Sequence, residues 1–183
     1  MRIYVASSWR NQFQQEVVQK LRSLGHEVYD FRGVGDGWGG ELTCEDCKQA
    51  KVHAYSDATT PGFFHTECPR HRGAGGFGWK KVDPDWQNWP SDIPRYLRGL
   101  EHPRAIEGFN RDMDALKAAD ACILVNPCGQ SAHAEYGWAC GAGKLTAAYC
   151  PAIREPDLMI KMGMYITDRW DQIELWLRVP LEL

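Results

Sequence analysis

The sequence predicts an α/β protein with a flavodoxin-like or Rossmann-like doubly wound parallel sheet of about five strands. Short β-branched and aromatic runs alternate with segments whose apolar residues recur at helical spacing. Outside one long insert, the connections between these runs are short. Alternating strands and helices with short connections favour parallel strands, with helices on both faces of the sheet.

The first 31 residues form one predicted βαβ unit. Residues 2–7 (RIYVAS) predict a strand. The polar segment that follows carries apolar residues at helical spacing and ends near Gly25, where a helix C-cap belongs. Residues 26–31 (HEVYDF) predict the next strand. This unit implies that the first two strands are parallel.

The second half of the chain repeats the alternation of helix and strand. The predicted elements are a helix with Ile106, Phe109, Met113 and Leu116 on one face, a strand over 121–126, a helix over 131–143, strands over 145–150 and 164–167, and a closing helix. With the first two strands, these elements complete the predicted sheet.

Length and composition indicate one globular domain over residues 1–183, with an inserted module over residues 37–76. The 183 residues are 44% hydrophobic and 25% charged, with a formal net charge of -3. No apolar stretch approaches a membrane span, and the N-terminus runs into a strand rather than a signal peptide. We therefore expect a cytoplasmic protein that does not bind membranes.

The insert carries cysteines and histidines at the spacing of a structural zinc site. A Cys-x2-Cys pair is followed after 17 residues by a His-x2-Cys pair, which fits tetrahedral coordination from two tight turns. The local spacing resembles treble-clef zinc knuckles. We expect zinc to order this glycine-rich segment, which has few apolar residues. The predicted ligands are Cys44, Cys47, His65 and Cys68, with His71 or His53 as alternatives to His65.

The charge of the insert indicates a structural or interface role for this knuckle. Between Glu41 and Arg72 there are five acidic and four basic side chains, without a basic stripe. Nucleic-acid binding needs such a stripe to neutralise phosphates. We therefore expect no nucleic-acid polymer as a partner.

Two turns after predicted strands are the first places to search for a ligand, because open parallel sheets bind ligands beyond the carboxyl ends of their strands. In the second turn, Ser131 is placed to cap a helix, and Glu135 follows inside the first turns of that helix. A helix start favours anions, so Glu135 is expected to be ionised. Glycosyl transfer uses such a carboxylate to stabilise or trap an oxocarbenium-like sugar.

Three segments resemble the nucleoside 2-deoxyribosyltransferase family and related nucleotide N-glycosidases: residues 3–9 (IYVASSW), 108–144 and 155–162 (EPDLMIKM). The most specific part is SAHAEYGWACGAGK. The resemblance implies a flavodoxin-like fold, a glycosyl-enzyme intermediate, and a base or water as acceptor, without an organic cofactor. It makes Glu135 the nucleophile.

The resemblance also implies roles for two further catalytic residues. Tyr4 matches a tyrosine that holds the nucleophile, although packing within the strand is the alternative. Asp112 matches an aspartate near the sugar, and Asp114 competes for the same role. The residues expected to bind substrate are Ser7, Ser8, Trp9, Asn110, Gly129, Ser131 and His133.

The sequence departs from the family pattern at the residue that recognises the nucleobase of the substrate. The transferases carry a base-recognising aspartate six residues before the nucleophile, and Gly129 stands at that position. The nucleotide-hydrolysing relatives hold a 5′ phosphate in this turn with small hydroxyl residues and backbone amides, which Ser7, Ser8, Gly129 and Ser131 would supply. The substrate is therefore a nucleoside or a nucleotide, and both transferase and hydrolase remain open.

Three tryptophans after the insert suggest further contacts. Trp79, Trp86 and Trp89 would form a lid over the base or an oligomer contact, with core packing as the alternative. We expect a homodimer or a larger homo-oligomer. Two hypotheses compete with the enzyme: a nucleotide-sensing module without chemistry, and an adaptor whose zinc knuckle binds another chain or nucleic acid.

Overall fold

The computed structural model describes residues 1–32 and 77–178. The predicted insert over 37–76 and its proposed zinc ligands lie outside these residues. The chain divides into two compact units, described separately below: residues 1–30 with 118–183, and Phe31–Lys117. None of the described helices combines the length and the apolar character that a membrane span requires.

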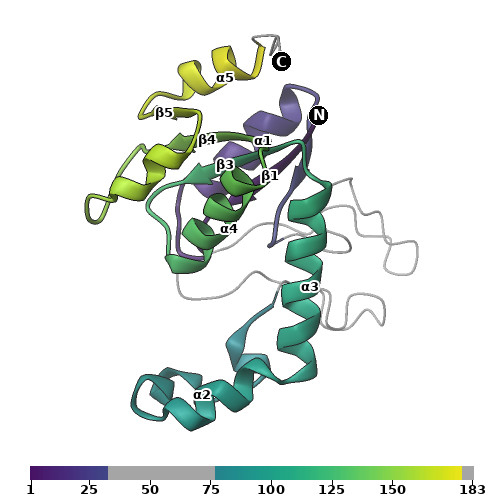
Figure 1. The fold of residues 1–183 in the computed structure, drawn as a ribbon, viewed down its shortest axis with the longest axis vertical. Coiled ribbons are helices and arrows are strands. Elements are labelled where there is room, and N and C mark those ends of the chain that lie inside the picture. The colour runs from purple at the N-terminus through teal and green to yellow at the C-terminus, as the bar shows by residue number, and fades with distance from the viewer. Residues whose placement is uncertain (33–76, 179–183) are drawn as a thin grey trace. The chain divides into compact units, whose positions relative to one another are not determined.

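The first unit contains a five-stranded parallel sheet (Figure 1). Its strands are β1 (Arg2–Ala6), β2 (Glu27–Tyr29), β3 (Ala121–Val125), β4 (Leu145–Tyr149) and β5 (Tyr165–Thr167). They lie in the order β2-β1-β3-β4-β5, and every neighbouring pair is parallel. This is the strand order of flavodoxin-like folds, which confirms the predicted fold class.

Helices cover both faces of this sheet. On one face, alternate strand residues such as Ile3 and Ile123 pack with Val17 of α1 (Gln14–Ser23) and Ile173 of α5 (Trp170–Arg178). Residues with the opposite parity, including Tyr4 and Cys122, face the other side, which α4 (Gln130–Gly141) covers. The sheet is therefore doubly wound.

The second unit is organised around a chain of aromatic rings. It contains η1 (Trp79–Lys81), η2 (Trp86–Ser91), α2 (Ile93–Leu100) and α3 (Pro103–Ala118). The ring of Trp89 lies 5.1 Å from that of Trp79 and 5.8 Å from that of Tyr96. A Cβ at Gly99 would overlap the Trp89 ring, so only glycine permits this approach of α2.

Trp89 is thus a core residue of the second unit. Core packing was the alternative to a lid or an oligomer contact in the sequence analysis. It is buried, and its indole Nε1 donates to Asp83 Oδ2 at 2.8 Å. Arg95 of α2 donates to both carboxylate oxygens of Asp83. Asp83 therefore joins the aromatic chain to α2.

The apolar face predicted for the helix before β3 is largely exposed. α3 forms as expected, and Leu116 is buried. By contrast, Ile106 is 44% exposed and Phe109 is 66% exposed. The small residues Ala105 and Gly108 form part of the buried face instead, because Gly108 packs against Phe77. The helical spacing was predicted correctly, but most of that face is not in the core.

Candidate active site

The turns that follow β1 and β3 are bonded to each other at the carboxyl edge of the sheet. The buried side chain of Asn11 donates to the carbonyl oxygens of Val125 at 2.8 Å and Pro127 at 3.1 Å. The Ser7 hydroxyl also donates to Val125 O, at 3.0 Å. The two turns therefore form one hydrogen-bonded platform at the edge of the sheet where a ligand site is predicted.

The start of α4 differs from the sequence prediction. Gly129 is the N-cap residue, and no side chain caps the helix. Ser131 lies inside the helix and is exposed, so its predicted role as the N-cap is wrong. The helix begins two residues before the predicted position of its cap would allow, because Gly129, with an extended backbone, already occupies the N-cap position. The N–H groups at the start of α4 are consequently left without a side-chain cap.

Glu135 is partly buried in the second turn of α4. The buried face of this helix is centred on Ala132 and Tyr136. Because successive helix residues are rotated by about 100°, Glu135 lies at one edge of this face and His133 at the other. The two side chains therefore leave α4 on opposite flanks.

The flank that carries Glu135 faces the sheet near β1 and β3. Burial, followed by the charge of Glu135, raises the pKa of the Cys122 thiol well above its usual value. Cys122 on β3 pairs in register with Tyr4 on β1, and both side chains point to the face that α4 covers. Glu135 and Tyr4 thus lie on the same side of the sheet.

Tyr4 is fully buried, and its ring stacks on Tyr29 with centroids 5.0 Å apart and an interplanar angle of 16°. The ring of Tyr4 therefore packs in the core, which was the alternative to its predicted catalytic role. The predicted role of its hydroxyl toward Glu135 stays a prediction.

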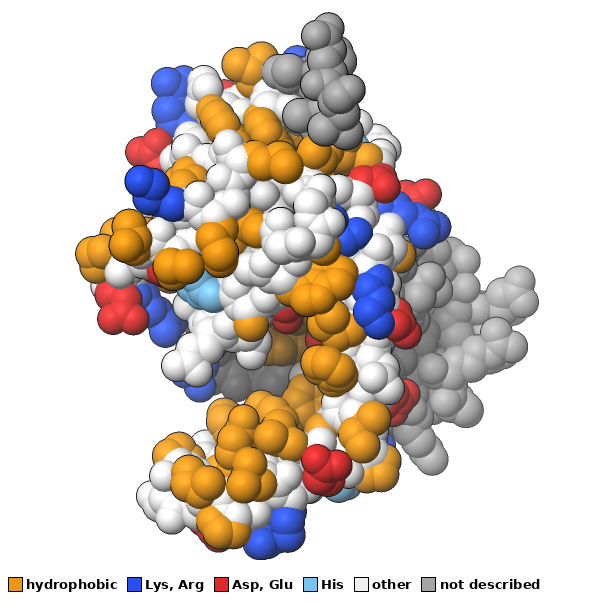
Figure 2. Space-filling view, in the orientation of Figure 1, with side chains coloured by type: hydrophobic (Ala, Val, Ile, Leu, Met, Phe, Trp, Pro, Cys, Tyr) orange, Lys and Arg blue, Asp and Glu red, His pale blue; other side chains and the backbone are white. Residues whose placement is uncertain are grey.

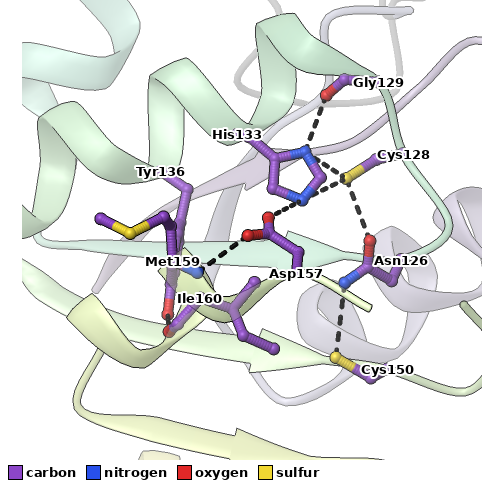
Figure 3. A network of polar contacts seen from close by, with 9 residues as sticks. All are labelled: Asn126, Cys128, Gly129, His133, Tyr136, Cys150, Asp157, Met159 and Ile160. Atoms are coloured by element: carbon purple, nitrogen blue, oxygen red, sulfur yellow. Dashed lines mark hydrogen bonds and ion pairs between the residues drawn. The ribbon is translucent and has the colours of Figure 1, made fainter. Parts of the chain in front are cut away.

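On the other flank of α4, His133 bridges two segments (Figure 3). Its Nδ1 lies 3.0 Å from the carbonyl oxygen of Gly129, and its Nε2 lies 3.0 Å from Oδ2 of Asp157. Asp157 Oδ1 also accepts a hydrogen bond from Met159 N at 2.8 Å, capping η3 (Leu158–Met162). The imidazole thus links the turn after β3 to the connection between β4 and β5.

A second contact between α4 and η3 lies one helical turn further on. The Tyr136 hydroxyl donates to the carbonyl oxygen of Ile160 at 3.2 Å (Figure 3). Gly163 follows η3, and a Cβ there would overlap the Tyr136 hydroxyl. The helix that carries Glu135 is therefore fixed against the β4–β5 connection at two points.

Cys128 lies beside His133 but is not arranged as a nucleophile. Its Sγ is 3.6 Å from His133 Nδ1 and donates to Asn126 Oδ1 at 3.3 Å. Asn126 Nδ2 in turn donates to Cys150 Sγ at 3.4 Å. Burial, with smaller effects from Cys150 and Glu135, raises the pKa of the Cys128 thiol to about 12. A thiol that keeps its proton at neutral pH is a poor nucleophile.

Most of the predicted site residues belong to the first unit. Tyr4, Ser7, Ser8 and Trp9 lie on β1 or in the turn after it, and Gly129, Ser131, His133 and Glu135 lie at the start of α4. Ser8 Oγ accepts from Arg10 N at 3.3 Å, and Trp9 is exposed. The structure therefore places these residues on β1, on α4 and in the turns that follow β1 and β3.

Two predicted residues belong to α3 in the second unit. Asp112 is partly buried, with its Oδ1 3.7 Å from Arg111 Nε, whereas Asn110 is exposed. Asp114, the alternative to Asp112, is exposed and lies 3.8 Å from Lys117 Nζ. Asp112 is thus more buried than Asp114, and this difference favours Asp112 as the candidate of the two.

Three residues that organise the site escaped the sequence prediction. Asn11 and Asn126 are buried amides in the two turns, and Asp157 comes from a distant connection. The sequence signal that could have identified these residues was their position directly after, or near, the ends of predicted strands. Within the part of the chain that the structure describes, no group of three or more His, Cys, Asp or Glu side chains could hold a metal ion.

Comparisons with known proteins give one structural likeness. No protein-family model matches the chain. No curated protein matches it either. The chain is similar to a solved 2-deoxyribosyltransferase from the psychrotolerant bacterium Bacillus psychrosaccharolyticus, with 17% sequence identity and a TM-score of 0.47. That alignment covers 95% of this chain and 90% of the other chain.

Proposed function

We propose that this protein cleaves or transfers the N-glycosidic bond of a nucleoside or nucleotide, with Glu135 as the nucleophile. The observation that carries the proposal is the position of Glu135. It is a partly buried carboxylate in the second turn of α4, the helix that follows β3. Ligands of doubly wound sheets bind beyond the carboxyl ends of the strands, where the following helices begin.

The start of α4 can bind an anionic group of a substrate. Its first N–H groups have no side-chain cap, and the positive end of the helix dipole favours negative charge nearby. The resemblance of residues 108–144 to the nucleoside 2-deoxyribosyltransferases supports a sugar carbon as the electrophile. The proposal for Glu135 therefore combines this resemblance with the position of the residue on α4.

The proposed reaction has two steps. In the first, a Glu135 carboxylate oxygen forms a bond to the anomeric carbon while the bond from that carbon to the base nitrogen breaks. The base leaves with the electron pair and takes up a proton. In the second, water or the nitrogen of another base attacks the anomeric carbon, loses a proton, and releases the Glu135 carboxylate.

Other residues would hold the reactants. Tyr4 lies on the same side of the sheet as Glu135, and in the proposal it orients the carboxylate. Asp112 is proposed to act near the sugar. His133 would act indirectly, because both of its ring nitrogens already face protein oxygen atoms, Gly129 O and Asp157 Oδ2.

A hydrolase acting on nucleoside 5′-monophosphates is the second candidate. It is favoured by the uncapped start of α4, where N–H groups can bind a phosphate. The hydroxyl of Ser7 contributes less to such a site, because its hydrogen is donated to Val125 O. Ser131 is exposed on the first turn of α4 and remains the better hydroxyl candidate.

Turnover of a substrate panel tests this proposal. The purified protein is incubated with ribonucleosides, deoxynucleosides and their 5′-monophosphates, with and without a second base, and the products are separated by chromatography. Base exchange identifies a transferase, and free base formed in water alone identifies a hydrolase. Binding of a nucleotide without any turnover across the panel would contradict the enzyme and favour a sensing module.

A zinc site in the insert is a separate proposal, based on the spacing of Cys44, Cys47, His65 and Cys68. Protein purified without chelator is expected to contain about one equivalent of zinc. The double substitution Cys44→Ser and Cys47→Ser should remove it, whereas Cys140→Ser on α4 should not. Less than about half an equivalent in the unmodified protein would contradict a tight structural site.

A further inference from the structure

Basic side chains of the second unit converge on one face of α3. Arg104 and Arg111 are seven residues apart, so they lie on one line along the helix. Gly108 lies on the same line between them, and a Cβ there would come within 2.9 Å of the Cβ of Phe77. Phe77 thus packs directly against this face, and η1, which ends at Lys81, begins two residues after it. We call Lys81, Arg104 and Arg111 the α3 basic cluster.

Lys81 lies within electrostatic reach of both arginines. Lys81 and Arg104 are exposed, and Arg111 is partly buried. Partial desolvation, followed by the charges of Arg104 and Arg111, lowers the pKa of the Lys81 ammonium. Positive charges that weaken each other's affinity for protons also repel one another. The folded chain therefore gives up some stability to hold this cluster together, and a bound anion would recover it.

The chain itself leaves both guanidinium groups largely without acceptors. In the described part of the chain, the Arg104 guanidinium makes no hydrogen bond or ion pair. Arg111 donates from Nη2 to the carbonyl oxygen of Phe31 at 3.4 Å, and its Nε lies 3.7 Å from Oδ1 of Asp112. A carboxylate at the latter distance does not accept a hydrogen bond. Both arginines can therefore donate to the oxygen atoms of a ligand.

The positive charge of this cluster is local. Residues 77–118 as a whole carry seven basic and seven acidic side chains. Glu107 is turned round the helix by about 60° from Arg104 and about 40° from Arg111, and it forms no ion pair with the residues that the structure describes. A nucleic acid or an anionic membrane would require an extended basic surface. A compact anion requires only a cluster of this kind.

The exposed apolar side of α3 is a different face of the helix. Figure 2 shows hydrophobic side chains gathered over α2 and along α3, where Ile106 is 44% exposed and Phe109 is 66% exposed. At about 100° per residue, these two positions are turned by about 160° and about 140° from Arg104. The basic cluster and the apolar side are therefore separate surfaces, and a small ligand at the cluster would leave the apolar side uncovered.

We propose that the α3 basic cluster binds the phosphate group of a small molecule. A phosphate monoester carries about two negative charges at neutral pH and offers several acceptor oxygens. Two guanidinium groups and an ammonium group can neutralise these charges and donate to these oxygens. Lys81 and Arg104 are exposed and so accessible to the ligand, and Arg111 is fixed by its bond to Phe31 O. This site differs from the serines of the first unit that the family resemblance implies for a 5′ phosphate, and the proposal is independent of the proposed function.

Isothermal titration calorimetry of the full-length protein tests this site with inorganic phosphate, pyrophosphate and a nucleoside 5′-diphosphate. We expect one equivalent of pyrophosphate to bind with a Kd of about 1 mM or lower. Lys81→Gln and Arg104→Gln should each raise that Kd about 10-fold, because each removes a charged donor. The matched controls are Lys80→Gln on η1 and Arg98→Gln on α2, which remove the same charges from exposed positions outside the cluster. Both controls should keep the Kd within about 2-fold of the unmodified value, because exposed charges are screened by salt.

The three probes distinguish the sources of the phosphate, because only the nucleotide carries a base and a sugar. Tighter binding of the nucleotide than of pyrophosphate would identify a nucleotide as the ligand, and equal binding would identify the phosphate group alone. The proposal would be overturned if no probe bound up to about 10 mM, or if Lys81→Gln and Arg104→Gln bound like the unmodified protein while circular dichroism shows them folded. It would equally be overturned if Ser131→Ala weakened binding and the two cluster variants did not, because the anion would then lie in the first unit.

Discussion

His133 Nε2 lies 3.0 Å from Asp157 Oδ2, and this contact joins the helix that carries Glu135 to the connection between β4 and β5. The same imidazole reaches Gly129 O with its other nitrogen. Together with the bond from Tyr136 to Ile160, it fixes α4 against η3. The helix that carries Glu135 is therefore held in place by His133 and Tyr136, which come from the same helix.

Breaking this contact is expected to destabilise the protein. Asp157→Ala removes the acceptor of both His133 and Met159 N and should cost about 1–2 kcal/mol of unfolding free energy. A double-mutant cycle with His133→Ala should give a coupling energy of about 0.5–1 kcal/mol. Denaturant unfolding of the four proteins measures both quantities. Strictly additive losses would show that the contact does not stabilise the fold.

Gly129 offers a direct test of base selectivity. Its φ of -101° suits any residue, and a Cβ there meets nothing within 4 Å. Gly129→Asp should therefore fold normally and supply the missing N-cap, changing stability by less than about 1 kcal/mol. We expect the carboxylate to change the relative turnover of different bases by about 10-fold.

The matched variant is Gly129→Ala, which fills the same space without a carboxylate. Comparing both variants with the unmodified protein on the same panel separates charge from bulk. If Gly129→Asp left the order and ratios of the bases unchanged, the base would not be recognised at this turn.

Burial of Cys128 predicts a low reactivity at neutral pH. Because burial raises its pKa to about 12, about one thiol in 10,000 is ionised at pH 8. Alkylation of Cys128 in the folded protein, followed by peptide mass spectrometry, should be much slower than in protein unfolded by urea. Rapid labelling of the native protein would contradict the buried, protonated thiol.

The same shift has a consequence for stability. In the unfolded chain the thiol ionises near its ordinary value of 9.0, whereas in the folded protein it keeps its proton to about pH 12. The unfolded state therefore binds fewer protons in this window, and stability falls as the pH rises from about 9 to 12. Cys128→Ala should show a shallower loss over that window. An equal loss in both proteins would contradict the shift.

The fold could be predicted because each element carries a local signal. Strand residues such as those of β3 form continuous apolar runs, and Gly25, with φ of 85°, stands just past α1 as predicted. The start of α4 was misjudged because a serine and a glycine both favour the N-cap, and only the backbone conformation distinguishes them.

Contacts between distant segments could not be predicted in the same way. Asp157 follows His133 by 24 residues, and nothing in the local pattern of either residue indicates that they meet. The apolar stripe of α3 was recognised from its period, but periodicity does not say which partner covers a stripe. The prediction for Glu135 used both its position at a helix start and the family resemblance.

The most direct test of the central proposal is a comparison of Glu135 variants on a substrate that the unmodified protein turns over. Glu135→Gln, which keeps the shape of the side chain, should lower kcat at least about 1,000-fold, while Glu155→Gln on the exposed β4–β5 connection should not. Rapidly quenched unmodified protein should carry one sugar on the peptide that contains Glu135. Turnover by Glu135→Gln at the unmodified rate would contradict the mechanism.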